Sequence, residues 1–176
     1  MTGATHEETP TNHHVYLGLG SNIPDRDAHL AAALEELAQI VTIERVSSVF
    51  DTAPMIVTDQ PRFHNLTIAA TTRLSPQELL RGVKAIERAL GRTGGPRYGP
   101  RVIDIDLLFY DQLVVQTDEL TIPHPRLAER AFVLAPLMEI APTLTHPTLR
   151  ETVTEMLRRV SGSDVVRLGP LPHSER

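Results

Sequence analysis

Several residue types are absent or scarce in this sequence, and each absence narrows the possible chemistry. The 176 residues contain no cysteine and no tryptophan. Without cysteine the chain can form no disulfide, no cysteine-ligated zinc site and no thiol nucleophile, which agrees with a reducing compartment, and we expect the protein in the cytoplasm. Lysine occurs once, at Lys84, where it follows Val83 rather than glycine, so a Walker A phosphate loop is absent.

Long apolar runs and an excess of positive charge are also missing. No stretch approaches the roughly 20 apolar residues of a membrane-spanning helix, and we expect no signal peptide in the polar N-terminal segment. The 17 lysines and arginines stand against 22 acidic residues, which gives a net charge of −5. We therefore expect neither a membrane nor a nucleic acid as a partner. Hydrophobic residues make up 41% of the chain, enough for a globular core.

The length of the chain predicts one domain with a tail at each end. Residues 1–13 are polar and lack periodicity, so we expect a disordered N-terminal tail. Residues 162–176 contain two prolines and little apolar periodicity, so we expect a flexible C-terminal tail. The single domain is predicted to span residues 14–161.

The apolar pattern predicts both strands and helices. Strand patterns lie at residues 15–19, 41–52, 63–72 and 102–110. Helical spacing lies at residues 27–40, 75–90, 127–140 and 148–160, with capping boxes predicted at Ser75–Glu78 and Thr148–Glu151. The order β-α-β-β-α-β predicts an α+β fold, a ferredoxin-like antiparallel sheet with its two helices on one face and additional C-terminal helices.

Two aspartates on one predicted strand are the most informative chemical feature. Asp104 and Asp106 lie two residues apart, so their carboxylates point to the same face of the strand while Ile105 points to the core. Carboxylates this close repel each other unless a cation lies between them, and Mg²⁺ prefers such oxygen ligands. An ordinary solvent-facing pair on a half-exposed strand remains the alternative, because the motif is short.

A segment rich in arginine and glycine precedes this strand. Residues 88–103 contain four arginines, four glycines, two prolines and no acid, although the whole chain is acidic. Guanidinium groups present paired donors that match phosphate oxygens. Arg92, Arg97 and Arg101, next to the two aspartates, therefore indicate a polyphosphate site. A solvated loop, or salt bridges from these arginines to the aspartates, is the alternative.

Four further features carry weaker signals. Phe63 and Asn65 share one face of their strand and offer a ring and an amide to a flat ligand, although a core phenylalanine beside a turn asparagine is the simpler interpretation. The glycines at residues 17–22 fit a turn that ends a strand, with its asparagine at positive φ. His124, between two prolines, could touch a phosphate or belong to a rigid turn. Phe132 is a core residue by default.

Five blocks around these residues together resemble a known enzyme family. They are GLGSN at 18–22, DTAPM at 51–55, DQPRFHN at 59–65, GPRVIDIDLLFY at 99–110 and PHPRLAERAFVLAPL at 123–137. In this order they resemble the 6-hydroxymethyl-7,8-dihydropterin pyrophosphokinases of folate synthesis, over about residues 15–157. The resemblance implies Mg²⁺-dependent transfer of pyrophosphate from ATP, the co-substrate, to the hydroxymethyl group of 6-hydroxymethyl-7,8-dihydropterin, with release of AMP.

The resemblance also implies roles for individual residues. Asp104 and Asp106 match the aspartates that hold two Mg²⁺ ions. Positions that match contacts to ATP are Glu87, Arg92, Arg97, Arg101, Leu107, Thr121, His124 and Arg130, and the three arginines of the loop would be the catalytic side chains. Positions that match contacts to the pterin are Thr52, Met55, Phe63, Asn65 and Phe132. The loops at 53–61 and 91–100 would act as lids, and neighbouring folate-pathway enzymes are candidate partners.

Two other functions remain compatible with these residues. Another metal-dependent phosphoryl or nucleotidyl transferase would share the aspartates and arginines but would need no pocket for a flat ligand. A non-catalytic small-molecule sensor module could use the same scaffold, since a fold does not determine a function. Release of AMP rather than pyrophosphate from ATP distinguishes the first alternative, and calorimetric titration with Mg-ATP distinguishes the second.

Overall fold

An antiparallel sheet forms the centre of the computed structural model, which describes residues 11–92, 94–160 and 164–172. Its strands lie in the order β5 (Asp104–Tyr110), β1 (His13–Ser21), β4 (Phe63–Thr72), β3 (Val49–Thr52) and β8 (Val165–Gly169). Strand β2 (Thr42–Val46) also pairs with β4, and every pair in this sheet is antiparallel. A separate ribbon is formed by β6 (Val115–Gln116) and β7 (Thr121–Ile122).

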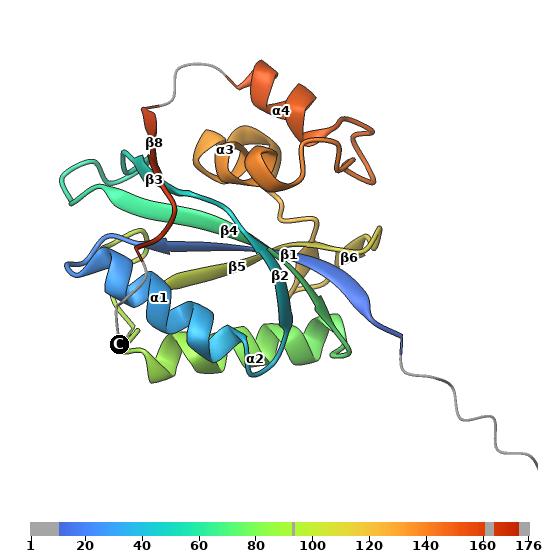
Figure 1. Cartoon of the computed structure of the whole chain (residues 1–176), viewed down its shortest axis with the longest axis horizontal. Coiled ribbons are helices and arrows are strands. Elements are labelled where there is room, and N and C mark those ends of the chain that lie inside the picture. The colour runs from blue at the N-terminus through green and yellow to red at the C-terminus, as the bar shows by residue number, and fades with distance from the viewer. Residues whose placement is uncertain (1–10, 93, 161–163, 173–176) are drawn as a thin grey trace, which may run out of the picture.

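Helices cover both faces of the sheet (Figure 1). Helices α1 (Arg26–Leu37) and α2 (Pro76–Ala89) lie on one face, and α3 (Ala131–Ile140) and α4 (Val153–Arg159) lie on the other. A 3₁₀ turn at Leu127–Glu129 precedes α3. The predicted α+β, ferredoxin-like arrangement with additional C-terminal helices is therefore confirmed. In the described part of the chain, no helix has the length and apolarity needed to cross a membrane.

Successive side chains along each strand point to opposite faces of the sheet, which divides the core into two layers. On β1, Val15, Leu17 and Leu19 are buried in the core that α1 and α2 cover. The residues between them point to the opposite face, where α3 and α4 contribute a second core around Leu134 and Leu137. Helix α3 packs on β4 and β3. The candidate site lies on this second face.

The strand predicted at residues 41–52 is divided into β2 and β3. The break falls at Ser47 and Ser48, where side-chain hydrogen bonds interrupt the regular strand pairing. The Ser47 Oγ atom accepts a hydrogen bond from the Thr67 N–H (2.9 Å), and the Ser48 N–H donates to a Glu139 carboxylate oxygen (2.6 Å). Serine hydroxyls compete with strand hydrogen bonds in this way.

One of the two predicted capping boxes is correct. The capping box of Ser75 and Glu78 opens α2 as predicted. The second prediction, at residues 148–151, is wrong, because Arg150 has a φ of 62°, which a right-handed helix does not allow. Helix α4 instead begins after Thr152, whose hydroxyl accepts from the Glu155 N–H (3.2 Å).

The prediction of a flexible segment at residues 162–176 is wrong for the part that forms β8. This strand pairs with β3 and extends the domain beyond residue 161. Ion pairs also hold it, from Arg62 to Asp164 and from Arg167 to Glu139 (2.7 Å). The predictions for residues 1–10, 161–163 and 173–176 lie outside the described residues.

Candidate active site

A row of three residues crosses the sheet at the base of the site. Asp104 on β5, Gly20 on β1 and Asn65 on β4 are cross-strand partners. Partners point to the same face, and neighbouring strands lie about 4.8 Å apart, so Asp104 and Asn65 rise from the sheet about 10 Å apart. A Cβ atom at Gly20 would lie 2.5 Å from Asn65 Oδ1. Glycine at position 20 therefore gives the Asn65 amide its room.

A second row lies beside the first. Asp106 on β5, Gly18 on β1 and Thr67 on β4 are again cross-strand partners. The two glycines leave the middle of the floor without side chains. Two carboxylates consequently line one side of this gap, and an amide and a hydroxyl line the other.

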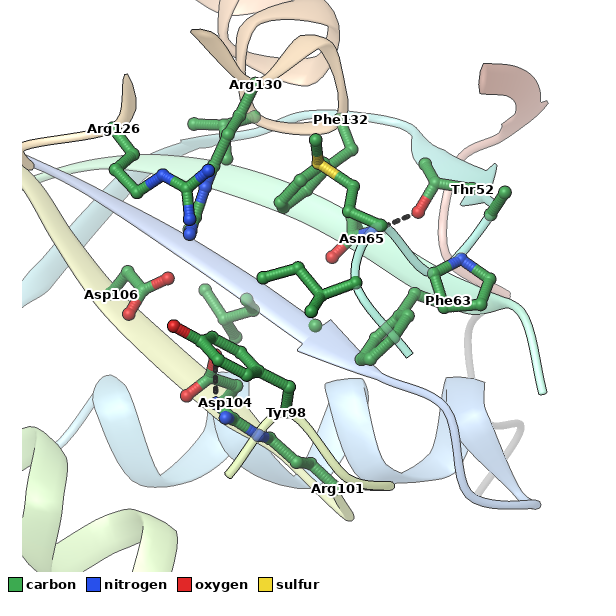
Figure 2. Close-up of a pocket in the computed structure, with 18 of the residues that line it drawn as sticks. Thr52, Phe63, Asn65, Tyr98, Arg101, Asp104, Asp106, Arg126, Arg130 and Phe132 are labelled. Atoms are coloured by element: carbon green, nitrogen blue, oxygen red, sulfur yellow. Dashed lines mark hydrogen bonds and ion pairs between the residues drawn. The ribbon is translucent and has the colours of Figure 1, made fainter. Parts of the chain in front are cut away.

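These rows form the floor of a pocket of about 280 Å³. Its walls include the loop around Met55, the loop carrying Tyr98 and Arg101, and the segment from His124 to Val133. Figure 2 shows Asn65 between the rings of Phe132 and Phe63, with the two aspartates on the other side of the pocket. A flat bicyclic ligand matches the size and the aromatic walls of this space.

The two aspartates have different surroundings. Asp104 forms ion pairs with Arg92 (2.8 Å) and Arg101 (3.0 Å). For Asp106, no hydrogen bond or ion pair is seen with any of the described residues. Burial, followed by the nearby negative charge of Asp104, raises the pKa of Asp106 to about 7. Arg92 and Arg101 thus pair with Asp104, whereas Asp106 has no ion-pair partner among the described residues.

The chemistry of this acid pair fits Mg²⁺. Asp104 and Asp106 offer oxygen ligands on one face of β5, and a cation beside them would offset both the burial and the repulsion from Asp104 that raise the pKa of Asp106. Within the described residues, no group of three or more histidine, cysteine or acidic side chains could hold a metal. Mg²⁺ is commonly bound by one or two carboxylates together with water and substrate phosphates. The pair therefore suits Mg²⁺ that arrives with a nucleotide.

Glu87 lies behind the acid-bearing strand. Its side chain is 2% exposed and comes from α2. One carboxylate oxygen accepts a hydrogen bond from the Ile105 N–H (2.8 Å) and lies 2.7 Å from an Arg92 nitrogen, and the other lies 3.2 Å from Lys84 Nζ. Because β5 is an edge strand, this carboxylate satisfies a main-chain donor between the two aspartates.

His124 and Arg130 belong to the opposite wall of the pocket. Burial, followed by the positive charge of Arg130, lowers the pKa of His124 to about 4. The His124 Nδ1 atom accepts a hydrogen bond from the Arg126 N–H (3.3 Å), so the neutral ring carries its proton on Nε2. His124 is thus a neutral hydrogen-bond donor beside a guanidinium group.

Asn22 connects the two loops that border the pocket. It is fully buried, and its amide nitrogen donates to Gln60 Oε1 (3.0 Å) and to the Pro61 carbonyl (3.1 Å). Its amide oxygen accepts from the Arg101 N–H (2.7 Å). A second link runs from Gln60 Nε2 to the Tyr98 carbonyl (3.0 Å). The loops at 53–61 and 91–103 are therefore tied together at their bases.

Most residues that the sequence predicted for the site line this one pocket. They are Thr52, Met55, Phe63, Asn65, Arg101, Asp104, Asp106, His124, Arg130 and Phe132. Arg92 and Arg97 line a second cavity, under the arginine loop. Glu87, Leu107 and Thr121 line neither cavity. The Leu107 side chain belongs to the core on the α1 and α2 side, so only its main chain remains available to a ligand on the other face.

Sequence reasoning missed three features of the site. The segment at residues 17–22 is not a turn with asparagine at positive φ: β1 continues through Ser21, and Asn22 has no positive φ. The link from Asn22 to Gln60 joins residues 38 positions apart, which no local pattern reveals. Thr67, in contrast, could have been found, because it follows Asn65 by two residues on the same strand.

Comparisons with known proteins show which family this chain resembles. Residues 16–142 match the family described as 7,8-dihydro-6-hydroxymethylpterin-pyrophosphokinase (HPPK). The 2-amino-4-hydroxy-6-hydroxymethyldihydropteridine pyrophosphokinase of Aquifex aeolicus is 42% identical over 80% of this chain and 88% of its own length. The Bacillus subtilis protein of that name is 43% identical over 84% of this chain and 90% of its own length. The mitochondrial folate synthesis bifunctional protein of Pisum sativum is 49% identical over 73% of this chain. The chain spans about a quarter of the length of that relative (25%).

Solved structures support the fold. A crystal structure of Plasmodium falciparum HPPK-DHPS with pterin and p-hydroxybenzoate has a TM-score of 0.70 and 17% sequence identity, over 87% of this chain and 42% of that chain. At this identity the likeness concerns the fold alone. The match over residues 16–142 and the relatives covered nearly end to end show the family: the chain belongs to the 7,8-dihydro-6-hydroxymethylpterin-pyrophosphokinase family.

Proposed function

We propose that this chain transfers the pyrophosphoryl group of ATP to the hydroxymethyl oxygen of 6-hydroxymethyl-7,8-dihydropterin and releases AMP. The observation that carries the proposal is the division of one pocket into two chemically different halves. Asp104 and Asp106 with Arg101 form one half, and Asn65 between two aromatic rings forms the other. The family membership of the chain supports the same reaction.

The aromatic half suits the pterin. Phe63 and Phe132 offer ring faces to a flat bicyclic system, and such stacking adds to the burial of apolar area. The Asn65 Nδ2 atom donates to Thr52 Oγ1 (2.6 Å), which fixes the orientation of the amide. Its Oδ1 atom then lies over Gly20 as an acceptor for ring or amino N–H groups. Met55, on the neighbouring loop, would complete this half of the pocket.

The charged half suits Mg-ATP. Asp104 and Asp106 would hold two Mg²⁺ ions, which supply charge neutralisation for the phosphates. Arg101 and Arg92 already form ion pairs with Asp104. When ATP binds, its phosphate oxygens would replace the Asp104 carboxylate as the acceptor for these two guanidinium groups. Arg97 comes from the same loop. His124 Nε2 and Arg130 offer further donors from the opposite wall.

The reaction needs placement more than proton abstraction. The hydroxymethyl oxygen attacks the β-phosphorus of ATP and loses its proton to solvent. A bond forms between oxygen and phosphorus, and the bond from that phosphorus to the oxygen of the α-phosphate breaks, so that AMP leaves. Phosphoryl transfer of this kind depends mainly on alignment and charge stabilisation. The floor of two glycines between the carboxylates and Asn65 would let the two substrates meet over β1.

Product analysis tests this function. Protein, ATP, Mg²⁺ and the reduced hydroxymethylpterin should give AMP and the pterin diphosphate, separated by chromatography. Asp104→Ala and Asp106→Ala should fold normally but lose Mg²⁺-dependent turnover, and Glu119→Ala, which exchanges an acid that lines neither cavity, serves as the control. Formation of ADP or pyrophosphate instead of AMP would favour another transferase. Binding of Mg-ATP and pterin without turnover would favour a sensor module.

The relatives support a proposal about the partners of this chain. Proteins named folate synthesis bifunctional protein and HPPK-DHPS contain a region similar to this chain. We infer contact with neighbouring enzymes of folate synthesis, which co-purification with those enzymes would test. A cytoplasmic location remains a prediction, to be tested by cell fractionation.

A further inference from the structure

Thr67 has a buried hydroxyl group with no hydrogen-bond partner in the part of the chain that the structure describes. The residue is 1% exposed, and its Oγ1 atom is unpaired. Its main chain is well paired: the Thr67 N–H donates to Ser47 Oγ (2.9 Å), and the Ser47 N–H donates to the Thr67 carbonyl (2.9 Å). A buried hydroxyl without a partner is unfavourable, so the hydroxyl does not stabilise the ligand-free protein.

Thr67 lines the pocket between its two chemical halves. It follows Asn65 by two residues on β4, so it lies on the same face, about 6.6 Å further along the strand. Across the sheet it faces Gly18, and beyond Gly18 it faces Asp106. Rotation about χ1 by about 120° can move the hydroxyl into the position that the methyl group occupied, which turns Oγ1 toward a ligand without moving the backbone.

The proposed substrate has acceptors suited to this position. In 6-hydroxymethyl-7,8-dihydropterin, the carbonyl oxygen at C4 and the ring nitrogen N5 lie on one edge, beside the carbon that bears the hydroxymethyl arm. If Asn65 reads the far edge and the arm points to the aspartates, this edge faces the part of the floor that contains Thr67. A hydroxyl donor there would satisfy an acceptor that is otherwise buried without a partner.

We propose that Thr67 is a further pterin-contacting residue, whose hydroxyl donates a hydrogen bond to the edge of the ring that carries the C4 oxygen and N5. This inference rests on the proposed function. The contact acts on binding and on discrimination, because a site built to hydrogen-bond a heteroatom disfavours an analogue that lacks it. Thr67 takes no part in moving protons or phosphates.

The test compares Thr67→Val with Thr67→Ser. Valine keeps the shape of threonine and removes the hydroxyl, and serine keeps the hydroxyl. Thr67→Val should melt at the same temperature as the wild type or higher, because an unpaired buried hydroxyl is lost. Its Kd for the pterin should rise roughly three- to tenfold, the effect of one neutral hydrogen bond, while its Kd for Mg-ATP stays unchanged. Thr67→Ser should retain most of the wild-type affinity for the pterin.

Ser21→Ala is the matched control. Ser21 is also fully buried with an unpaired hydroxyl, but it lies on the β1 face toward α1 and α2 and does not line the pocket, so its variant should bind the pterin normally. Wild-type pterin affinity in Thr67→Val would overturn the inference, as would a lower melting temperature with loss of both ligands. If the wild type itself binds no pterin, the proposed function fails, which is a distinct result.

Discussion

The carboxylate of Glu87 should stabilise the acid-bearing edge of the sheet, and its removal gives a quantitative test of that role. Glu87 accepts a hydrogen bond from the Ile105 N–H, and Arg92 and Lys84 surround it. Glu87→Ala would leave the Ile105 N–H without its acceptor, at the position between Asp104 and Asp106. Glu87→Gln would keep an oxygen for this hydrogen bond but remove the negative charge.

The magnitudes follow from these contacts. A hydrogen bond to a charged acceptor contributes about 1.5–3 kcal/mol, and breaking a buried ion pair costs about 3–5 kcal/mol. Arg92 is 27% exposed and keeps Asp104 as a partner, and Lys84 is 42% exposed, so the loss lies at the lower end of the ion-pair range. We expect Glu87→Ala to lower the free energy of unfolding by about 3 kcal/mol and Glu87→Gln by about 1 kcal/mol. For a chain of this length, about 3 kcal/mol corresponds to a decrease in Tm of roughly 6–12 °C.

Urea and thermal denaturation measure both variants against an exposed control. Glu129 is 69% exposed and pairs with Arg126 at 3.7 Å, so Glu129→Ala should change the free energy of unfolding by less than about 1 kcal/mol. If Glu87→Ala is as stable as this control, the structural role is refuted. Unchanged stability with a large loss of ATP affinity would instead support the nucleotide contact that the family resemblance implies for Glu87.

Three further changes probe the pocket. Asp106→Asn should reduce Mg²⁺-dependent AMP formation by at least roughly 100-fold without destabilising the fold, because it removes a charge next to Asp104; near-normal turnover in an AMP assay would contradict this. His124 should stay neutral from pH 8 to about 5.5 in an NMR titration, because its pKa is about 4, and a titration midpoint near 6.5 would be the opposite result. The stability linked to the neutral form of His124 should be lost only as the pH falls from about 6.5 toward 4. Gly20→Ala should raise the KM for the pterin with little change in Tm, because the new Cβ displaces the Asn65 amide; equal pterin KM in both proteins would count against it.

Much of the fold could be predicted because most of its helices and strands bury one face, and this leaves a periodic apolar pattern in the sequence. Val15, Leu17 and Leu19 alternate along β1, and the capping box of Ser75 and Glu78 marks the start of α2. The acid pair was predictable for the same reason. Ile105 is 1% exposed, so the residues on both sides of it must point to the other face.

Elements that depend on distant partners could not be predicted. In β8, Val166 and Leu168 are 51% and 54% exposed, so the strand has no buried alternation that the sequence could reveal. Its place depends on β3 and on pairs such as Arg167 with Glu139, 28 positions apart. The break between β2 and β3 likewise depends on Ser47 meeting Thr67. Local patterns contain none of these contacts.

The two glycines of β1 serve different purposes, and this difference explains how the site is built. Neither Gly18 nor Gly20 has a positive φ, so the backbone does not require glycine at either position. At Gly20 a Cβ would approach Asn65 Oδ1 to 2.5 Å, whereas at Gly18 it would meet Leu108 at an ordinary 3.5 Å. Gly20 therefore makes room for a protein group. Gly18 would accept alanine in this structure, and it lines the pocket between Asp106 and Thr67, where the two proposed substrates would meet.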